Sequence, residues 1–214
     1  MKTVIKLGGV NGSGKTTVAR ALLKAIDSKP YVYMLQSGKM TLGYRGEWNG
    51  LSVEVLGKYG PGCGGMDTIS NKDDRFEMVK MIASLSSVDV VFFEGLITGK
   101  TYGALGELSE AHRTFGEAVW LYAFMDTPFD VAADRVRKRR MAAGNSAPFD
   151  PERTMRSTYE SCTRLETYLR GTAKGRIEIG VDHPVHSIKH TDRPYSAARK
   201  LLEQAVKVRS LHAN

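Results

Sequence analysis

The sequence has few cysteines, no long apolar run and no repetitive or low-complexity segment. Only two cysteines, Cys63 and Cys162, occur in 214 residues, which excludes a disulfide framework and a cysteine-based metal knuckle. No stretch approaches the roughly 18 unbroken apolar residues of a membrane span. The first seven residues lead straight to glycine, too soon for the apolar core of a secretion signal. We therefore expect a cytoplasmic protein with no membrane segment and with nothing preceding the fold.

The composition is that of a globular protein whose positive charge is concentrated in one region. Hydrophobic residues make up 42% and charged residues 25% of the chain. Residues 135–176 hold eleven Lys and Arg against four acids, so this region carries +7 of the net charge of +8. Such a field attracts polyanions, either a triphosphate or a nucleic acid. The alternative is a solvated helix face without a partner.

Apolar runs and amphipathic stretches alternate along the chain, which predicts one α/β domain spanning residues 1–214. Strands are expected at 3–7, 31–35, 88–93, 118–125 and 185–190. Helices are expected at 15–26 and 72–85, from Pro128, from Pro151, and at 194–208. The glycine-rich stretch 37–65, with a hairpin-like turn at 48–51, is expected to be an inserted ribbon or loop system.

The strongest motif follows the first strand and reads Gly9-Val10-Asn11-Gly12-Ser13-Gly14-Lys15-Thr16. Its glycines allow a tight turn whose N–H groups point at one anion, and the next helix adds the positive end of its dipole. In this pattern Lys15 contacts the β- and γ-phosphates and the Thr16 hydroxyl ligates Mg²⁺. The motif therefore predicts a nucleoside triphosphate site. The residues expected to bind the nucleotide are Asn11, Gly12, Ser13, Gly14, Lys15, Thr16 and Thr17.

A second functional element is the apolar strand at 88–93, which ends in Glu94. This is the layout of a Walker B element, in which a carboxylate stands beside the phosphate loop. Such a carboxylate holds Mg²⁺ through water or orients the attacking group. The alternative is that Glu94 only caps the following turn. We expect Glu94 to act in metal binding and in catalysis.

Two other segments resemble nucleotide motifs but fail on position. Gly99-Lys100-Thr101 has Glu94, not glycine, five residues before its glycine, so no anion-binding loop can form there. Asn71-Lys72-Asp73-Asp74 fits the guanine-reading pattern of GTPases, yet it precedes Glu94 instead of following a late buried strand. We therefore expect ATP as the phosphoryl donor.

The segment Asp126-Thr127-Pro128 opens a helix that becomes strongly basic from Arg135 to Arg140. This arrangement resembles the strand–Asp-x-Pro–helix–arginine lid of nucleoside and nucleoside-monophosphate kinases in the P-loop superfamily. The resemblance implies an arginine-rich lid at about 135–155. In it, Arg135 would bind the nucleotide and Arg139 would neutralise charge on the transferring group and help to exclude water.

The glycine-rich segment 57–68 is expected to hold the phosphoryl acceptor, because P-loop kinases place acceptor residues between the second strand and the next helix. Asp67 is the candidate general base for a substrate hydroxyl. The alternative is that Asp67 is the N-cap of the next helix. Cys63 has no nearby histidine in sequence to activate it, so we interpret it as a structural thiol.

The same segment, Gly-Lys-Tyr at 57–59 and Cys-Gly-Gly-Met-Asp-Thr at 63–68, resembles the phage-encoded P-loop kinases that phosphorylate 5-hydroxymethyluridine within DNA. The resemblance implies a three-layer α/β P-loop kinase fold with a mostly parallel central sheet, a glycine-rich inserted hairpin at about 37–65 and the lid. It also implies ATP and Mg²⁺ as cofactors and DNA containing a modified base as partner. The basic region would then follow the DNA backbone.

A base within a duplex is inaccessible to a kinase pocket and has to be flipped out. Tyr44, Trp48 and Tyr59 are hypothesised to stack on it or on the gap that it leaves. Two other functions stay open. One is a kinase of a free nucleoside or nucleotide, which needs no polyanion surface. The other is a P-loop ATPase switch, which uses the loop to change shape around a partner.

Overall fold

The computed structural model describes residues 2–35, 37–60, 64–69, 74, 77–78, 81–82, 85–95, 118–171 and 185–211, with only the backbone of Asp67 and Tyr168. The helices are α1 (Lys15–Ala25), η1 (Met66–Thr68, one 3₁₀ turn), α4 (Phe129–Ala142), α5 (Pro151–Gly171) and α7 (Pro194–Leu211). The strands are β1 (Thr3–Gly8), β2 (Lys29–Met34), β3 (Met40–Trp48), β4 (Leu51–Leu56), β5 (Lys58–Tyr59), β6 (Gly64–Gly65), β7 (Val90–Glu94), β8 (Val119–Asp126) and β9 (Val185–Lys189).

A mixed, mostly parallel sheet forms the centre of the described structure, in the order β2-β3-β4-β7-β1-β8-β9. The run from β4 to β9 is parallel throughout, whereas β2 and β3 pair antiparallel at one edge. β1 is buried along its whole length, as expected for a parallel strand covered on both faces. Its register pairs Leu7 with Glu94, so β1 and β7 end at the same edge of the sheet. Ligands bind at this edge in α/β proteins.

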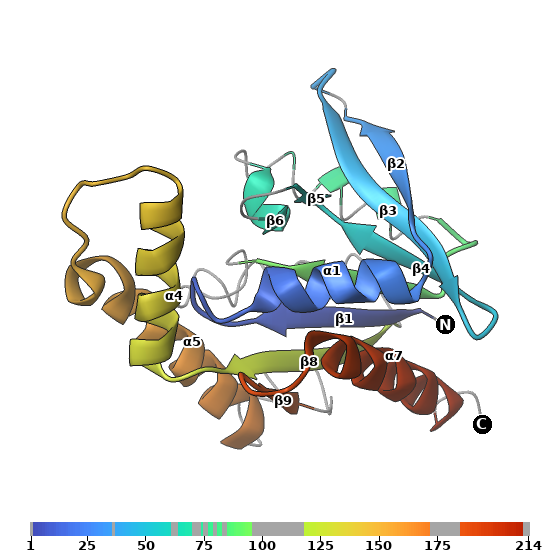
Figure 1. The fold of residues 1–214 in the computed structure, drawn as a ribbon. Helices are drawn as coiled ribbons and strands as arrows, with labels where there is room; N and C mark the ends of the chain where they lie inside the picture. Colours follow the sequence, from blue (N-terminus) through green and yellow to red (C-terminus); the bar gives the residue numbers. More distant parts are fainter. Residues whose placement is uncertain are drawn as a thin grey trace.

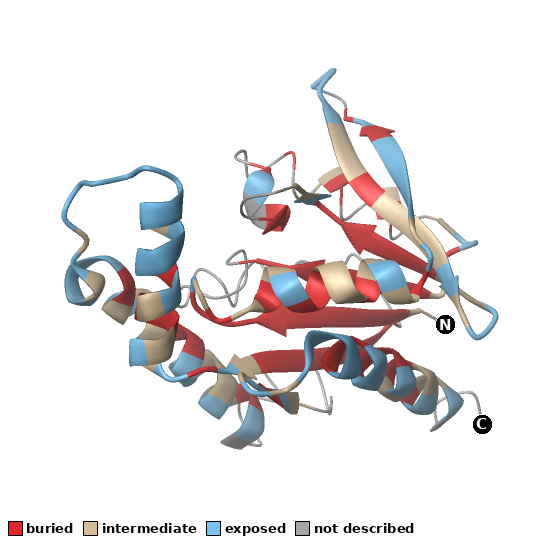
Figure 2. Cartoon of the chain, viewed as in Figure 1, coloured by how far each residue is buried: buried red, intermediate tan, exposed pale blue. Residues whose placement is uncertain are grey.

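Helices cover both faces of the sheet (Figure 1). α1 and α7 pack on one face, where Val18, Leu22 and Leu201 join the buried side chains of β1, β4 and β7. On the other face, Leu169 of α5 and Met78 join a second cluster around Trp120. Figure 2 shows the strands between them as the most deeply buried part of the molecule. Two apolar layers therefore hold the carboxyl ends of the strands in fixed positions.

The hairpin turn predicted at 48–51 is present, but the stretch 37–65 is not wholly an inserted ribbon or loop system. β3 and β4 are joined by Asn49 and Gly50, whose φ angles of 48° and 77° are those required by a two-residue hairpin turn. β4 then runs parallel to β7 within the main sheet, with Val53 beside Val90. The strand that precedes the acceptor segment is therefore β4 and not the strand predicted at 31–35. Gly43 and Gly46 interrupt the pattern of β3 and make the strand hard to recognise in the sequence.

A buried carboxyl group lies where β2, β3 and β4 meet. Glu54 is fully buried, accepts a hydrogen bond from the Tyr33 hydroxyl, and contacts Arg45 Nε at 2.7 Å. Burial outweighs the contact with the guanidinium and raises the pKa of Glu54 to about 8. This cluster joins the edge strands to the rest of the sheet.

Several predicted elements are confirmed within the described residues. α5 begins at Pro151 and buries Met155, Cys162 and Leu169, as their spacing predicted. Of the helix predicted at 72–85, only residues 74, 77–78 and 81–82 are described, and all are helical, with Ile82 buried. The decoy motifs at 71–74 and 99–101 lie outside the described residues, apart from Asp74. No described helix has the length and apolar character needed to cross a membrane.

Candidate active site

The phosphate loop connects β1 to α1 and turns at three glycines. Gly9, Gly12 and Gly14 have φ angles of 144°, 82° and 104°, which side chains with a Cβ rarely adopt. Ser13 N–H donates to the carbonyl oxygen of Val10 at 3.1 Å and tightens the turn. Gly14 is the N-cap of α1, so the free N–H groups of the first helical turn face the loop. The loop has the backbone geometry of an anion cradle.

The Lys15 side chain lies inside this loop and is buried. Its ammonium donates to the carbonyl oxygens of Gly9 at 2.9 Å and Val10 at 3.1 Å. These carbonyls hold the ammonium within the curve of the loop. A bound phosphate group would meet a positive charge at that position.

Thr16 and Glu94 are in direct contact. The Thr16 hydroxyl donates to Oε1 of Glu94 at 2.9 Å, and the Glu94 side chain is almost fully buried at the end of β7. A hydroxyl and a carboxylate are the oxygen donors that Mg²⁺ accepts, and Mg²⁺ in triphosphate sites takes its other ligands from water and phosphate. Consistent with that, no cluster of three His, Cys, Asp or Glu side chains occurs in the described part of the chain. The donor set therefore fits a nucleotide-bound Mg²⁺.

α4 fixes the other side of the loop. A Cβ on Gly12 would lie 2.2 Å from the carbonyl oxygen of Ala132, so only glycine permits this approach of α4. The Thr127 hydroxyl, just before α4, donates to the carbonyl oxygen of Ser13 at 3.0 Å. Val136 packs in the same small cluster as Val10. The sequence pattern around Asp126 and Pro128 did not reveal this anchoring by Thr127.

Arg135 and Arg139 lie one helical turn apart on α4 and both line a cavity of about 290 Å³ in front of the loop. Arg135 donates to the carbonyl oxygens of Gly12 and Ser13, each at 3.4 Å, and to that of His190 at 3.5 Å. Residues 11–18, which contain the predicted nucleotide-binding residues Asn11 and Thr17, line the same cavity. The two predicted lid arginines thus lie beside the phosphate loop.

The far wall of the cavity is formed by residues that were not predicted from the sequence. Met125 follows the buried part of β8, His190 and Asp192 belong to the turn between β9 and α7, and Pro194 is the first residue of α7. His190 N–H donates to the Asp126 carbonyl oxygen at 3.0 Å, which ties this turn to the end of β8. The one feature of the sequence that could have indicated these residues is that the turn follows a parallel strand, because ligands bind at the carboxyl edge of such sheets.

The glycine-rich acceptor segment packs directly on the Thr16–Glu94 pair. A Cβ on Gly65 would lie 2.6 Å from the Glu94 carbonyl oxygen and 2.8 Å from its Oε1. A Cβ on Gly64 would lie 3.0 Å from Cγ2 of Thr16. Gly57, at the other end of the hairpin, would clash with the Gly65 backbone if it had a Cβ. The glycines therefore bring this hairpin within contact distance of the expected metal ligands.

Asp67 follows in η1, two residues after Gly65. Its side chain lies outside the described residues, as does Cys63, so neither prediction is tested. The neighbouring Thr68 hydroxyl donates to the Gly65 carbonyl oxygen at 2.7 Å, and Lys58 N–H donates to that hydroxyl at 3.4 Å. Gly65, and not Asp67, is the N-cap of η1. The start of the helix predicted at 72–85 lies outside the described residues, so the alternative that Asp67 is its N-cap is not tested.

The hypothesis that Tyr44, Trp48 and Tyr59 stack on a flipped base is not supported. All three are partly buried and pack against the core on the α1 face. The rings of Tyr44 and Tyr59 contact each other with centroids 5.9 Å apart, and Arg199 lies over the ring of Trp48 at 5.8 Å. These aromatic rings therefore contact other side chains of the same chain.

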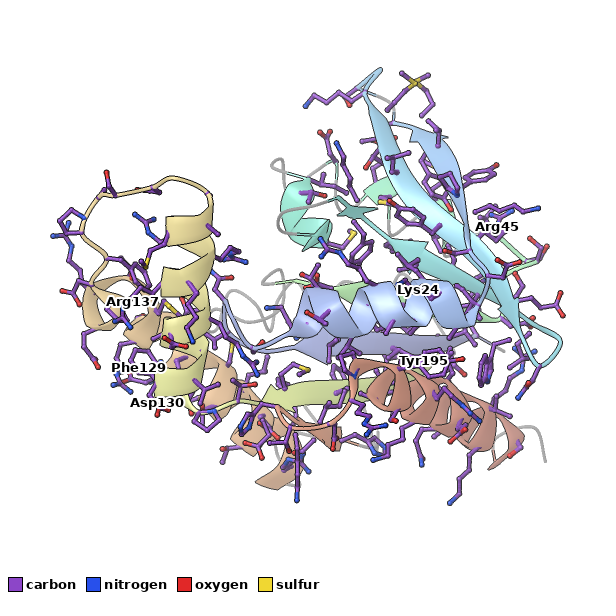
Figure 3. All side chains as sticks on the ribbon, in the orientation of Figure 1. Lys24, Arg45, Phe129, Asp130, Arg137 and Tyr195 are labelled. Carbon is purple, nitrogen blue, oxygen red and sulfur yellow. The ribbon has the colours of Figure 1, made fainter. Side chains whose placement is uncertain are left out.

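The basic region is less uniform than its composition indicated. On α5, Arg156, Arg164 and Arg170 each pair with a glutamate four residues earlier. In the described part of the chain, Arg137 and Arg153 have no ion-pair partner, and Arg139 has none either. Lys174 and Arg176 lie outside the described residues. Arg137, labelled in Figure 3, and Arg139 lie on α4, whereas Arg153 lies in the first turn of α5.

No family model matches the chain. It is 30% identical over 192 residues to the 5-hmdU DNA kinase of Pseudomonas phage PaMx11, covering 87% of this chain and 95% of that protein. It is 28% identical over 141 residues to the 5-hmdU DNA kinase of Pseudomonas phage M6, with coverages of 63% and 71%. It is 27% identical over 165 residues to that of Delftia phage PhiW-14, with coverages of 70% and 57%.

Among solved structures, an unliganded sugar kinase from Janibacter sp. HTCC2649 aligns over 95% of this chain and 93% of its own, with 14% identity and a TM-score of 0.42. That score is too low to support any inference. The relationship in sequence to the PaMx11 protein reaches 30% identity and covers nearly the whole length of that protein. The chain therefore belongs to the family of phage 5-hmdU DNA kinases and is a phosphotransferase.

Proposed function

We propose that the protein transfers the γ-phosphoryl group of ATP, with Mg²⁺, to the hydroxymethyl group of 5-hydroxymethyluracil in DNA. The names of its relatives supply the substrate class. The observation that carries the proposal is the contact of Gly64 and Gly65 with Thr16 and Glu94. It brings a glycine-rich acceptor segment next to the position of the γ-phosphate.

On the donor side, Lys15 and the loop residues Asn11 to Thr17 bind the triphosphate. The backbone N–H groups of the loop and the N-terminus of α1 orient the β- and γ-phosphates, and the Lys15 ammonium neutralises them. Thr16 and Glu94 hold Mg²⁺, directly or through water. Bound there, Mg²⁺ supplies the charge that stabilises the transferring phosphoryl group.

α4 provides the arginines that complete the donor site. Arg139 neutralises charge on the γ-phosphoryl group during transfer, and Arg135 binds the nucleotide. We propose that residues 135–155 act as a lid within a single domain spanning 1–214. The nucleoside base lies against the turn containing His190, because that turn lines the same cavity as the loop and Arg135.

On the acceptor side, Asp67 is proposed as the general base. Its carboxylate takes the proton of the hydroxymethyl group while the hydroxyl oxygen forms a bond to the γ-phosphorus, and ADP leaves with the electron pair of the broken bond. Asp67 is two residues from Gly65, which itself contacts Glu94. Glu94 is the alternative base, and Asp67→Asn separates the two. Retained transfer with intact ATP binding would assign the role to Glu94.

Competition between acceptors tests the proposed substrate. The enzyme is incubated with γ-labelled ATP and equal concentrations of duplex DNA containing 5-hydroxymethyluracil and free 5-hydroxymethyl-deoxyuridine. We expect the label in DNA. Equal or greater labelling of the free nucleoside would make the protein a nucleoside kinase. Rapid ATP hydrolysis that no acceptor increases would instead favour an ATPase switch.

A further inference from the structure

The ribbon formed by β2 and β3 exposes an unusual amount of apolar surface. Of the six large hydrophobic side chains that are exposed among the described residues, four lie on this ribbon. Val32 is 53% exposed, Met34 62% and Met40 71%, and Tyr31 is 44% exposed. Large apolar side chains gathered on one projecting element mark an interaction surface.

The most exposed of these side chains share one face of the ribbon. The register pairs Met34 with Met40 and Val32 with Leu42. Side chains alternate along a strand, so this face is also the face of Tyr44, which packs with the α1-side core. We call Val32, Met34, Met40 and Leu42 the apolar strip.

The opposite face of the ribbon is fastened to the rest of the molecule. Lys39, beside the tip, pairs with the buried Asp74 at 2.9 Å. Further down, Arg45 and Tyr33 both bond to Glu54 of β4. These contacts hold the ribbon in one orientation, so the apolar strip is presented on a rigid support.

The apolar strip leads from the tip of the ribbon to the acceptor segment. Tyr44 contacts the ring of Tyr59, which pairs with Gly64 across β5 and β6, and Gly64 contacts Thr16. At a rise of about 3.4 Å per residue, Met40 stands about 14 Å beyond Tyr44 along β3. In Figure 1 the ribbon and α4 rise on opposite sides of β5 and β6.

A second copy of the chain is a poor occupant for this surface. β2 is an edge strand, which could in principle pair with another β2. However, Leu35 N–H donates to the Lys39 carbonyl oxygen. The backbone N–H and C=O groups of the odd-numbered residues of β2 therefore point towards β3, and those of the even-numbered residues point to the open edge of the sheet. Pro30 is one of the outward positions and has no N–H group. Only the N–H groups of Val32 and Met34 therefore remain on β2 to donate hydrogen bonds to a strand of a second copy.

The charge of the ribbon fits an anionic partner. Residues 29–46 contain no acidic residue; of their three cations, Lys39 pairs with Asp74 and Arg45 with Glu54, and Lys29 has no ion-pair partner among the described residues. A two-stranded ribbon fits the major groove of DNA, which is about 8.5 Å deep, less than the length of the apolar strip. Proteins that open a base stack insert apolar side chains, methionine included, between base pairs.

Building on the proposed function, we propose that the ribbon enters a groove of duplex DNA and that Met34 and Met40 insert between base pairs beside the target nucleotide. The two methionines occupy the gap left in the stack, and the flipped base is presented to Gly64 and Gly65. Single-stranded DNA has no paired stack to open, so the apolar strip is needed only for duplex substrates.

The test compares duplex and single-stranded DNA of the same sequence, each with one 5-hydroxymethyluracil, using Met34→Ala/Met40→Ala. Tyr195→Ala on α7 is the matched control, since it also removes an exposed large side chain, 51% exposed, and α1 lies between it and the ribbon in Figure 3. We expect the double variant to lose at least about tenfold in kcat/KM on the duplex and less than about twofold on the single strand. A 2-aminopurine beside the target should brighten on binding wild-type protein but not the double variant.

Other outcomes overturn the proposal. The double variant could retain duplex activity, or lose activity equally on both substrates. Wild-type protein could sediment as a dimer that Met34→Ala/Met40→Ala dissociates, which would make the ribbon an interface between copies. Wild-type protein that labels only free nucleoside would remove the proposed function and this proposal together, whereas labelled DNA with an unaffected variant removes this proposal alone.

Discussion

Gly65→Ala is expected to impair phosphoryl transfer by displacing Glu94. Gly65 has a φ of 78°, and its added Cβ would meet the Glu94 carbonyl oxygen at 2.6 Å and the carboxylate atoms Cδ and Oε1 at 2.8 Å. A Cβ essentially never approaches another heavy atom within 3.0 Å. Either the hairpin or Glu94 therefore has to move, and Glu94 holds the Thr16 hydroxyl at 2.9 Å.

The substitution has two separable effects. The backbone conformation of Gly65, with φ 78° and ψ −160°, is essentially restricted to glycine and costs an alanine about 1–3 kcal/mol in folding free energy. The displaced carboxylate additionally disturbs the Mg²⁺ site, and a misplacement on the order of 1 Å at a reacting centre costs up to about 100-fold in rate. We expect a loss of about 10- to 100-fold in kcat/KM together with a requirement for more Mg²⁺.

Gly38→Ala is the matched control, because Gly38 has nearly the same φ, 76°, but no atom within 4 Å of an added Cβ. Gly38→Ala should lower Tm through backbone strain alone and Gly65→Ala should lower it further through the clash with Glu94, and only Gly65→Ala should lose activity in a Mg²⁺ titration with the labelled-ATP assay. Wild-type kinetics for Gly65→Ala, or equal losses in both variants, would refute the role given to this contact.

Thr127→Val removes the hydroxyl that anchors the phosphate loop and should weaken ATP binding by about tenfold, measured by calorimetry, whereas unchanged affinity would show that α4 packing suffices. Glu54→Gln removes a carboxyl whose pKa burial raises to about 8. Between pH 4.5 and 8, Glu54 is ionised in the unfolded chain but still protonated in the folded protein. As the pH rises through this range, the free energy of unfolding of the wild type should fall by up to about 1.4 kcal/mol per pH unit relative to the variant, measured by denaturant unfolding. Parallel pH profiles for the two proteins would contradict this. Arg137→Ala on α4 and Arg153→Ala in the first turn of α5 should each reduce the salt slope of DNA binding by about 1, while Arg164→Ala, which removes an arginine already paired with glutamate, should reduce it less; equal slopes for all three variants would exclude Arg137 and Arg153 as phosphate contacts.

The parts of the site that were predictable from sequence depend on local backbone chemistry. The phosphate loop requires glycines at fixed spacing followed by a helix, and Glu94 ends an unbroken apolar strand, so both are visible in a few consecutive residues. The 3–4 spacing of Met155, Tyr159, Cys162, Leu165 and Leu169 likewise predicted the inward face of α5, on which the first, third and fifth of these are buried and the other two partly buried.

What escaped prediction depends on contacts between distant segments. That β4 lies beside β7 is set by the burial of Val53 and Val55 within a glycine-rich stretch that reads as a loop. The approach of His190 to Arg135 joins residues 55 positions apart. The ion pairs of the α5 arginines could have been predicted from the sequence, because each of these arginines has a glutamate four residues earlier. A count of charges by segment does not distinguish paired from unpaired groups.

The most direct test of the account is nucleoside analysis by mass spectrometry of duplex DNA containing 5-hydroxymethyluracil, after incubation with ATP and Mg²⁺. Wild-type protein should convert 5-hydroxymethyl-deoxyuridine to its phosphorylated form, and Lys15→Ala should leave the nucleoside unchanged. An unmodified base after incubation with active wild-type protein, or equal conversion by Lys15→Ala, would contradict the proposed transfer from the phosphate loop to DNA.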